Sequence, residues 1–183
     1  MRDSGVKVVL TGEGSDEIFA GYPFFRRDLL LHGAHGLDPE TRRRLLAELE
    51  AGNRVSSGNL MPQGGTELHA VRRVLGYVPS NLEAWAQIGH GLLSLVDDAF
   101  TAEFAGRDTF RVMLSGLDVE RQLSGRDCVN QSLYIWAKTN LPNYILSNLG
   151  DRMEMAHSVE GRLPFHDHHV VEEAVRMPVT LKI

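Results

Sequence analysis

Three carboxylates and two glycines lie within one short stretch near the start of the sequence, residues 12–17, called here the acidic turn. The acidic turn follows the apolar run at residues 6–10. A glycine-rich turn after a strand exposes backbone N–H groups, which is where open α/β sheets bind phosphates. Carboxylates repel phosphates unless a divalent cation bridges the two, so these acids indicate Mg²⁺. The alternative is that Ser15 or Asp16 caps a helix while the glutamates face water.

A second dense group of charged residues lies at residues 151–165. The guanidinium of Arg152 can hold a carboxylate or phosphate in a fixed orientation, so Arg152 and the neighbouring Asp151 are candidates for binding a ligand. Glu160 and Arg162 are more simply structural partners of each other in a partly buried polar network.

The elements that must position these groups are one strand and many helices. Residues 6–10 have the composition of a buried strand, and no comparable run follows. A parallel strand needs neighbours, so its sheet must come from weak strands or from sequence outside these residues. The stretch 53–65 is rich in glycine, serine and asparagine and predicts a long loop. Periodicity and capping residues predict helices at about 17–31, 38–52, 66–75, 80–95, 99–105, 118–123, 127–140, 142–149 and 168–176.

The bulk composition excludes several classes of function. A length of 183 residues with 43% hydrophobic residues suits one soluble domain or a large piece of one. The net charge of −5 disfavours nucleic acid as a partner. No apolar run approaches the roughly 20 residues that span a bilayer, and no signal peptide follows Met1. The single cysteine, Cys128, excludes an intramolecular disulfide, and a cytoplasmic protein is expected.

Together the two charged segments resemble the synthetase domain of the class B, glutamine-hydrolysing asparagine synthetases. That family carries S/T-G-E-G-S-D-E-x-F-x-G-Y after a strand, matched by residues 11–22, the first motif. It also carries L-P-x-x-x-L and then D-R-M-x-M-A-x-S-x-E-x-R-x-P-F-x-D, matched by residues 141–167, the second motif. The resemblance implies an α/β fold, as a mostly helical fragment of an adenine nucleotide alpha hydrolase-like (ATP pyrophosphatase) domain with one clear parallel strand near the N-terminus.

The resemblance also implies a two-step reaction. An aspartate side chain attacks the α-phosphate of ATP, and ammonia from a glutaminase domain then attacks the aspartyl-AMP to give asparagine. ATP and Mg²⁺ are the implied cofactors, aspartate or another carboxylic acid is the implied substrate, and a homo-oligomer is compatible with the family.

Residue roles follow from the resemblance position by position. Glu13 is implied as the acid/base residue near the ammonia and the tetrahedral intermediate, where positioning and proton transfer both lower the barrier. Asp16 is implied as the ligand of Mg²⁺ at the pyrophosphate end. The remaining implied contacts are with pyrophosphate or ATP at Gly12, Gly14 and Ser15, and with the acyl substrate at Asp151 and Arg152.

Several features of the family are missing from these residues. Its ATP loop, S-G-G-x-D-S, lies upstream of the first motif, and its glutaminase domain has a cysteine where Arg2 stands here. Its catalytic lysine is expected shortly after Ile183. Residues 114–118 echo the ATP loop, but they are predicted to form a turn in which Asp118 caps a helix. We therefore expect residues 1–183 to be a partial synthetase domain that is inactive by itself.

Other residues attract attention because of their type. Residues 166–169, His-Asp-His-His, are of metal-ligand types, but adjacent side chains diverge, so helix capping by Asp167 is favoured over a metal site. His166 also replaces the leucine of the family pattern. Cys128 is predicted to be a packed thiol, and Trp85 and Trp136 are predicted to be core residues.

Two other interpretations of the function stay open. A natural-product cyclase of the β-lactam-synthetase or peptide-cyclising type would use the adenylating site on a larger acid. A noncatalytic helical interaction module would need neither the ATP loop nor the lysine.

Overall fold

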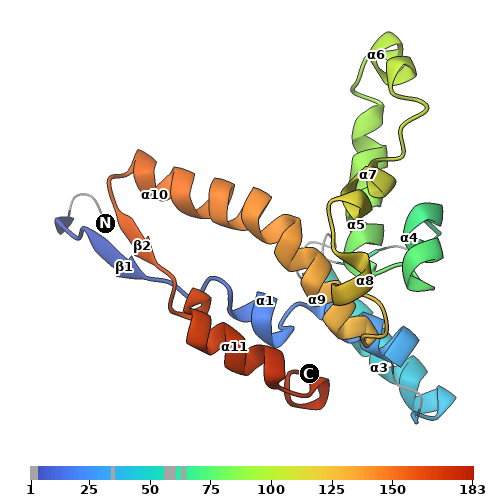
Figure 1. The fold of residues 1–183 in the computed structure, drawn as a ribbon, viewed down its shortest axis with the longest axis horizontal. Coiled ribbons are helices and arrows are strands. Elements are labelled where there is room, and N and C mark those ends of the chain that lie inside the picture. The colour runs from blue at the N-terminus through green and yellow to red at the C-terminus, as the bar shows by residue number, and fades with distance from the viewer. Residues whose placement is uncertain (1–3, 34–35, 56–60, 63–64) are drawn as a thin grey trace. The chain divides into compact units, whose positions relative to one another are not determined.

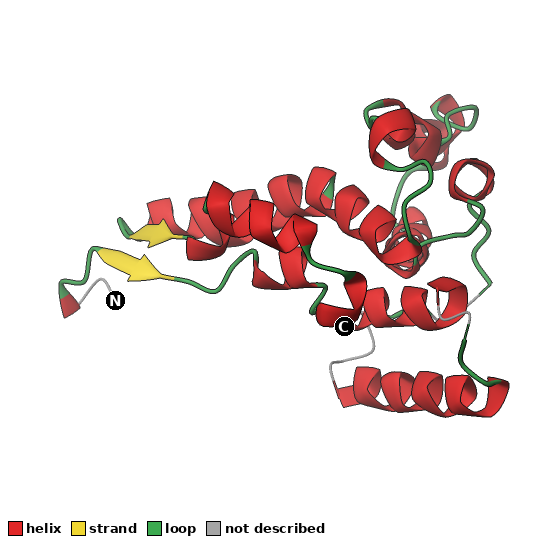
Figure 2. Cartoon of the chain, turned by 60° about the horizontal axis from the view of Figure 1, so that its bottom comes forward, coloured by secondary structure: helices red, strands yellow, loops and turns green. Residues whose placement is uncertain are grey.

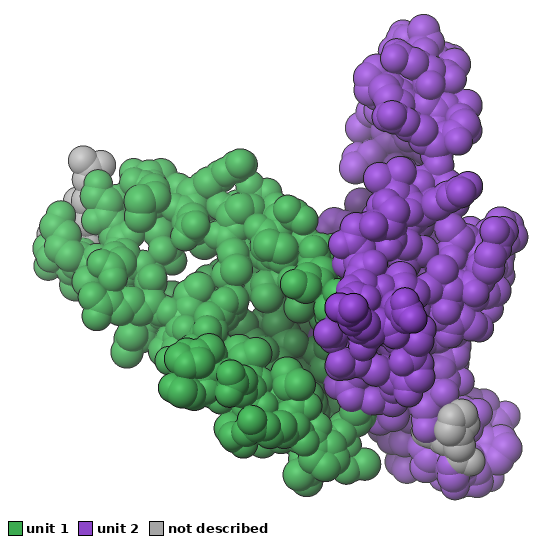
Figure 3. Space-filling view, in the orientation of Figure 1, with its two compact units in different colours: residues 1–22, 133–183 green, residues 23–132 purple. Residues whose placement is uncertain are grey.

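The computed structural model describes residues 4–33, 36–55, 61–62 and 65–183. These residues fall into two compact units, residues 1–22 with 133–183 and residues 23–132 (Figure 3). Helices make up most of the described chain, beside one two-stranded parallel sheet (Figure 2). This agrees with the predicted mostly helical α/β class. No helix in the described ranges is both long enough and apolar enough to cross a membrane.

The sheet of the first unit pairs the two ends of the chain. Strand β1 (Val8–Leu10) runs parallel to β2 (Glu160–Arg162), with Val9 opposite Gly161 (Figure 1). Hydrogen bonds from the Glu160 N–H to the Lys7 carbonyl (2.8 Å) and from the Thr11 N–H to the Arg162 carbonyl (3.0 Å) extend the ladder.

The prediction of a buried strand at residues 6–10 is wrong in two respects. The strand is shorter, and its apolar side chains are exposed, Val8 by 40% and Leu10 by 74%. Only β2 pairs with β1 among the described residues, so the sheet is too small to cover these side chains.

The helical elements of the first unit follow the two motifs. They are α1 (Ser15–Phe19), the end of α9 (Cys128–Lys138), a π-helix (Leu141–Asp151), α10 (Arg152–Ala156), a 3₁₀ turn (Pro164–His166), α11 (His168–Arg176) and a last 3₁₀ turn (Val179–Leu181). Helix α11 has the predicted bounds, and the carboxylate of Asp167 caps it by accepting from the His169 N–H at 2.9 Å. The rings of Phe19 and Phe165 meet edge to face at 6.2 Å, which packs the first motif against the second.

The second unit is helical throughout its described part. Its elements are α2 (Pro23–Asp28), a π-helix (Leu29–Gly33), α3 (Pro39–Val55), α4 (His69–Leu75), α5 (Ser80–Leu93), α6 (Asp98–Glu103), α7 (Thr109–Ser115), α8 (Val119–Gln122) and the start of α9. Helix α7 was not predicted, and α4 begins later than expected. The predicted loop at 53–65 starts inside α3, and its residues 56–60 and 63–64 lie outside the described part.

The single helix predicted at 17–31 is instead broken. Helix α1 stops because Ala20 adopts a left-handed conformation with φ of 57°. The chain turns at Gly21 and starts α2 at Pro23, whose fixed φ suits the first turn of a helix. Because of this break, α1 is a short helix of its own that begins within the acidic turn.

Aspartates cap three of the short helices in the second unit. Asp97, Asp108 and Asp118 accept hydrogen bonds from N–H groups in the first turns of α6, α7 and α8. The capping role predicted for Asp118 is therefore confirmed. The N-terminus of α5 has no side-chain cap from its own segment.

A fully buried carboxylate, Asp28, takes over that role for helix α5. It accepts from the Ser80 N–H at 2.8 Å and from the Ser132 hydroxyl at 2.6 Å. Burial raises the pKa of Asp28 to about 6, although these hydrogen bonds lower it. Asp28 thus joins three segments of the unit through one side chain.

The predicted core residues divide into correct and incorrect cases. Cys128 is buried, and burial raises the pKa of its thiol to about 11, as suits a packed thiol. Trp136 is buried, but Trp85 is 40% exposed, so its assignment to the core is wrong.

Candidate active site

The acidic turn closes on itself. The N–H and the hydroxyl of Ser15 both donate to the carbonyl of Gly12, at 3.2 and 2.8 Å. Gly14 has φ of +91°, a left-handed conformation that glycine adopts at little cost. The Ser15 donors that the resemblance directs at pyrophosphate are therefore engaged within the turn in this structure.

Glu13 brings the two motifs together. Its Oε2 lies 3.3 Å from the point where a Cβ at Gly150 would stand, and Gly150 directly precedes Asp151. Absence of a side chain at position 150 lets the carboxylate approach the backbone of the second motif. Residues far apart in the sequence therefore meet at Glu13.

Glu154 is a site residue that the sequence analysis did not single out. Its Oε2 accepts from the Gly161 N–H of strand β2 at 2.8 Å. A Cβ at Gly161 would overlap the carboxylate of Glu154, so the glycine is required for this contact. The close approach of an acid to a strand N–H leaves no mark in sequence periodicity.

The carboxylates of this region repel one another. The pKa of Glu13 is raised first by burial and then by the negative charges of Glu154, Glu17 and Asp151, while His166 lowers it. The pKa of Asp16 is likewise raised by burial and by Glu17. Such a cluster favours a bound cation, or a proton on one of its members.

Glu17 is an anchor rather than a water-facing glutamate. It is 5% exposed and accepts from the Tyr22 hydroxyl at 2.8 Å. The ring of Tyr22 packs on Trp136 at 5.3 Å, and burial followed by the bond to Glu17 raises the pKa of Tyr22. The alternative in which both glutamates face water is therefore wrong for Glu17.

His166 lies against the acidic turn. A Cβ at Gly14 would overlap its imidazole, and its Nε2 is buried without a hydrogen-bond partner in the described part of the chain. The signal in the sequence was the departure from leucine at this position. The remaining histidines of the segment, His168 and His169, stack on each other at 3.8 Å.

Two predicted site residues lie apart from Glu13 in their contacts. Arg152 is exposed and donates to the Asn148 Oδ1 at 2.6 Å. Asp16 is exposed, and its carboxylate lies against the backbone of Gly21. Glu160 and Arg162 pair with each other at 2.8 Å as predicted, but the pair is exposed, so the expected partly buried network is wrong for these two residues.

A resident metal would find few ligands here. Within the described ranges, no three or more His, Cys, Asp or Glu side chains are arranged to hold an ion. Mg²⁺ often uses only one or two carboxylates together with substrate phosphates. The carboxylate of Asp16, whose pKa is raised by partial burial and then by repulsion from Glu17, fits a cation of that kind.

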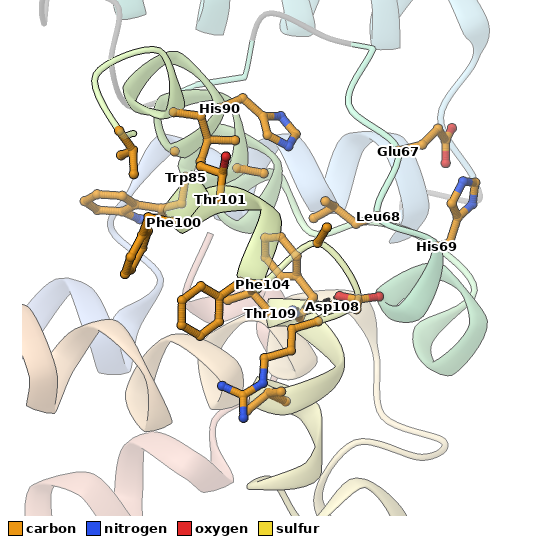
Figure 4. A pocket seen from close by; sticks show the side chains of 18 residues that line it. Glu67, Leu68, His69, Trp85, His90, Phe100, Thr101, Phe104, Asp108 and Thr109 are labelled. Carbon is orange, nitrogen blue, oxygen red and sulfur yellow. Dashed lines mark hydrogen bonds between the residues drawn. The ribbon is translucent and has the colours of Figure 1, made fainter. Parts of the chain in front are cut away.

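A separate cavity of about 920 Å³ lies within the second unit (Figure 4). Its wall is largely apolar and includes Trp85, Phe100 and Phe104, with the guanidinium of Arg107 5.6 Å from the centre of the Phe104 ring. It contains none of the predicted site residues.

Comparison with known proteins shows to which family the chain belongs. The family model of asparagine synthase matches residues 1–183, which is the whole chain. The chain belongs to the asparagine synthase family. No solved structure matches it.

Individual members of the asparagine synthase family also match nearly the whole of this chain. The amidase chyE of Penicillium rubens is 34% identical over 98% of this chain and 27% of its own length. A putative glutamine-hydrolysing asparagine synthetase of Mycobacterium bovis is 32% identical over 97% of this chain and 25% of its own length. Asparagine synthetase 1 of Bacillus subtilis is 29% identical over 97% of the chain and 26% of its length. The chain thus spans about a quarter of the length of these relatives.

Proposed function

We propose that residues 1–183 belong to the synthetase domain of a longer enzyme, with an adenine nucleotide alpha hydrolase-like fold, that forms an amide in two steps. A carboxylate oxygen of the acid attacks the α-phosphate of ATP, the bond from that phosphorus to pyrophosphate breaks, and an acyl-adenylate results. Ammonia then attacks the acyl carbon, and AMP leaves. The observation that carries this proposal is Glu13 beside Gly150, which unites both family motifs.

Glu13 serves as the acid/base residue in this proposal. The nitrogen that has attacked the acyl carbon bears a positive charge, and it must lose a proton before the amide is complete. Burial and the neighbouring carboxylates raise the pKa of Glu13, which makes it a stronger proton acceptor than an ordinary glutamate. Its contact with Gly150 holds the carboxylate against the second motif.

The other residues of the acidic turn bind the phosphates of ATP in this proposal. Asp16 would hold Mg²⁺, which supplies charge neutralisation for the phosphates when it is bound. The backbone of Gly12 and Gly14 would approach the leaving pyrophosphate, where the absence of side chains allows close contact. Ser15 would contribute only after its bonds to Gly12 open.

The acyl substrate falls to the second motif in this proposal. We assign it to aspartate, bound near Asp151 and Arg152 with ammonia from a glutaminase domain in the same cytoplasmic enzyme. The Arg152 guanidinium would have to leave Asn148 to reach a substrate carboxylate. Such a rearrangement is small, because the bond joins exposed side chains of one helical segment.

A second candidate substrate class is a larger natural-product acid. Amidase chyE matches at 34% identity, a little above the 32% of the putative mycobacterial synthetase, so a relative named for another activity is at least as similar. Acid-dependent exchange of labelled pyrophosphate into ATP tests both candidates, because it reports the acyl-adenylate for any acid. Exchange that depends on aspartate supports asparagine synthesis, and exchange with larger acids alone supports the second class.

The absence of exchange with every acid would contradict amide formation and favour an interaction module. The test requires the full-length enzyme. We expect the 183-residue chain by itself to bind ATP weakly and to make no amide, because it spans about a quarter of the length of its relatives, 27% in the case of chyE.

A further inference from the structure

Two groups at the acidic turn, the imidazole of His166 and the carboxylate of Glu13, have no hydrogen-bond partner among the described residues. The Nε2 atom of His166 is buried and has no partner in the described part of the chain. The carboxylate of Glu13, a short distance along the turn, accepts no side-chain or backbone hydrogen bond from any described residue. Buried polar atoms in folded proteins almost always have a partner, so the Nε2 atom of His166 calls for one, and the partly exposed carboxylate of Glu13 offers an acceptor in the same turn.

The fold holds the imidazole of His166 against the turn. The ring lies on Gly14, the residue after Glu13, so closely that a Cβ at position 14 would overlap it. Its backbone is fixed by the 3₁₀ turn Pro164–His166, whose last N–H donates to the Leu163 carbonyl at 2.9 Å. His166 therefore reaches the acidic turn from the 3₁₀ turn of the second motif.

The charged groups around Glu13 have opposite effects on the ionisation of its carboxylate. Glu154, Glu17 and Asp151 all disfavour the charged form of Glu13, and among its described neighbours His166 is the one that favours it. Loss of His166 would leave the carboxylate facing like charges alone.

We propose that His166 is a positioning residue that donates a hydrogen bond from Nε2 to the Glu13 carboxylate when the site is assembled for reaction. The bond fixes the orientation of Glu13 and keeps it ionised, so that it can accept the proton of the attacking nitrogen. The inference rests on the proposed role of Glu13 in amide formation. Other members that carry the leucine of the family pattern at this position would orient the glutamate by other contacts.

The direct test is a ¹³C NMR titration of glutamate-labelled full-length enzyme, with the Glu13 signal assigned by its loss in Glu13→Gln. We expect His166→Leu to move the Glu13 titration to higher pH. The matched control is His168→Leu, since His168 is exposed and stacks on His169. An unmoved Glu13 titration in His166→Leu would overturn the pairing, whatever the activity of the enzyme.

Kinetics separate this inference from the proposed function. The rising limb of the pH profile of amide formation should move to higher pH in His166→Leu, with the rate reduced more below the limb than on the plateau. His166→Gln keeps a donor without the charge, so it should restore the plateau rate but not the position of the limb. A shifted NMR titration with an unshifted rate profile would keep the pairing and remove Glu13 as the base.

Discussion

The carboxylate of Glu13 lies over the backbone of Gly150, with Oε2 3.3 Å from the point where a Cβ at that residue would stand. This approach joins the acidic turn to the second motif, as does that of His166 to Gly14. It depends on a glycine within the π-helix Leu141–Asp151, where glycine is otherwise a poor choice for stability.

Gly150→Ala should therefore separate stability from activity. The added methyl group displaces the Glu13 carboxylate by a few tenths of an ångström, and we expect about a tenfold lower rate of amide formation. The substitution should leave the free energy of unfolding unchanged or raise it by about 0.5–1 kcal/mol, because alanine is the better helix former. Steady-state kinetics and urea unfolding measure the two effects.

The control for Gly150→Ala is Gly52→Ala. Gly52 lies in helix α3, and a Cβ there meets no atom within 4 Å. The control should gain the same helix propensity with no loss of rate. An equal loss of rate in both variants would contradict the role of the Gly150 contact.

Gly14→Ala should destabilise the protein through two costs. The left-handed φ of +91° costs alanine about 1–2 kcal/mol, and the new methyl group also displaces the imidazole of His166. Gly76→Ala isolates the first cost, because Gly76 has φ of +83° and open space around it. We expect Gly14→Ala to lower the unfolding free energy more than Gly76→Ala; equal losses would show that His166 yields freely.

Asp28 should make the stability of the chain depend on pH. Its pKa in the folded protein is about 6, above its value of 3.8 without burial, so the folded state binds the proton more tightly than the unfolded state. Its contribution favours folding fully below pH 3.8 and is lost as the pH rises through 6. The loss over this window is on the order of 3 kcal/mol.

Asp28→Asn should remove that dependence, because asparagine does not titrate and keeps an acceptor for Ser80. Unfolding free energies measured by urea denaturation at several pH values test this, with Asp97→Asn as the control. Asp97 is an exposed helix cap, and asparagine caps about as well as aspartate. A pH slope that survives in Asp28→Asn would assign the titration to another group.

The sequence predicts those elements whose signals are local. Helix α11 was predicted with its observed bounds, since Asp167 caps it through a bond to the nearby His169 N–H. Helix α7 carries the same signal at Asp108, which the sequence analysis overlooked. Strand β2 could not be found in this way, because Glu-Gly-Arg has no strand composition and is extended by pairing with β1.

In the candidate site, too, residues with a local sequence signal were predicted and residues placed by folding were not. Its first members were found because Glu13 and Asp16 stand in a recognisable motif. Glu154 and His166 were not assigned roles, because the folded chain alone creates their close approaches, that of Glu154 to Gly161 and that of His166 to Gly14. The N-terminal cap of α5 has no local signal either, since its acceptor is Asp28, 52 positions earlier in the sequence.

The partial reactions of Glu13→Gln in the full-length enzyme test the central claim most directly. Glutamine keeps the shape of the side chain but cannot accept a proton, so amide formation should fall by at least about a hundredfold. Acid-dependent exchange of pyrophosphate into ATP should survive, because it precedes the attack of ammonia. Glu173→Gln, at an exposed ion pair on α11, should leave both reactions unchanged. Amide formation by Glu13→Gln at the wild-type rate would contradict the account.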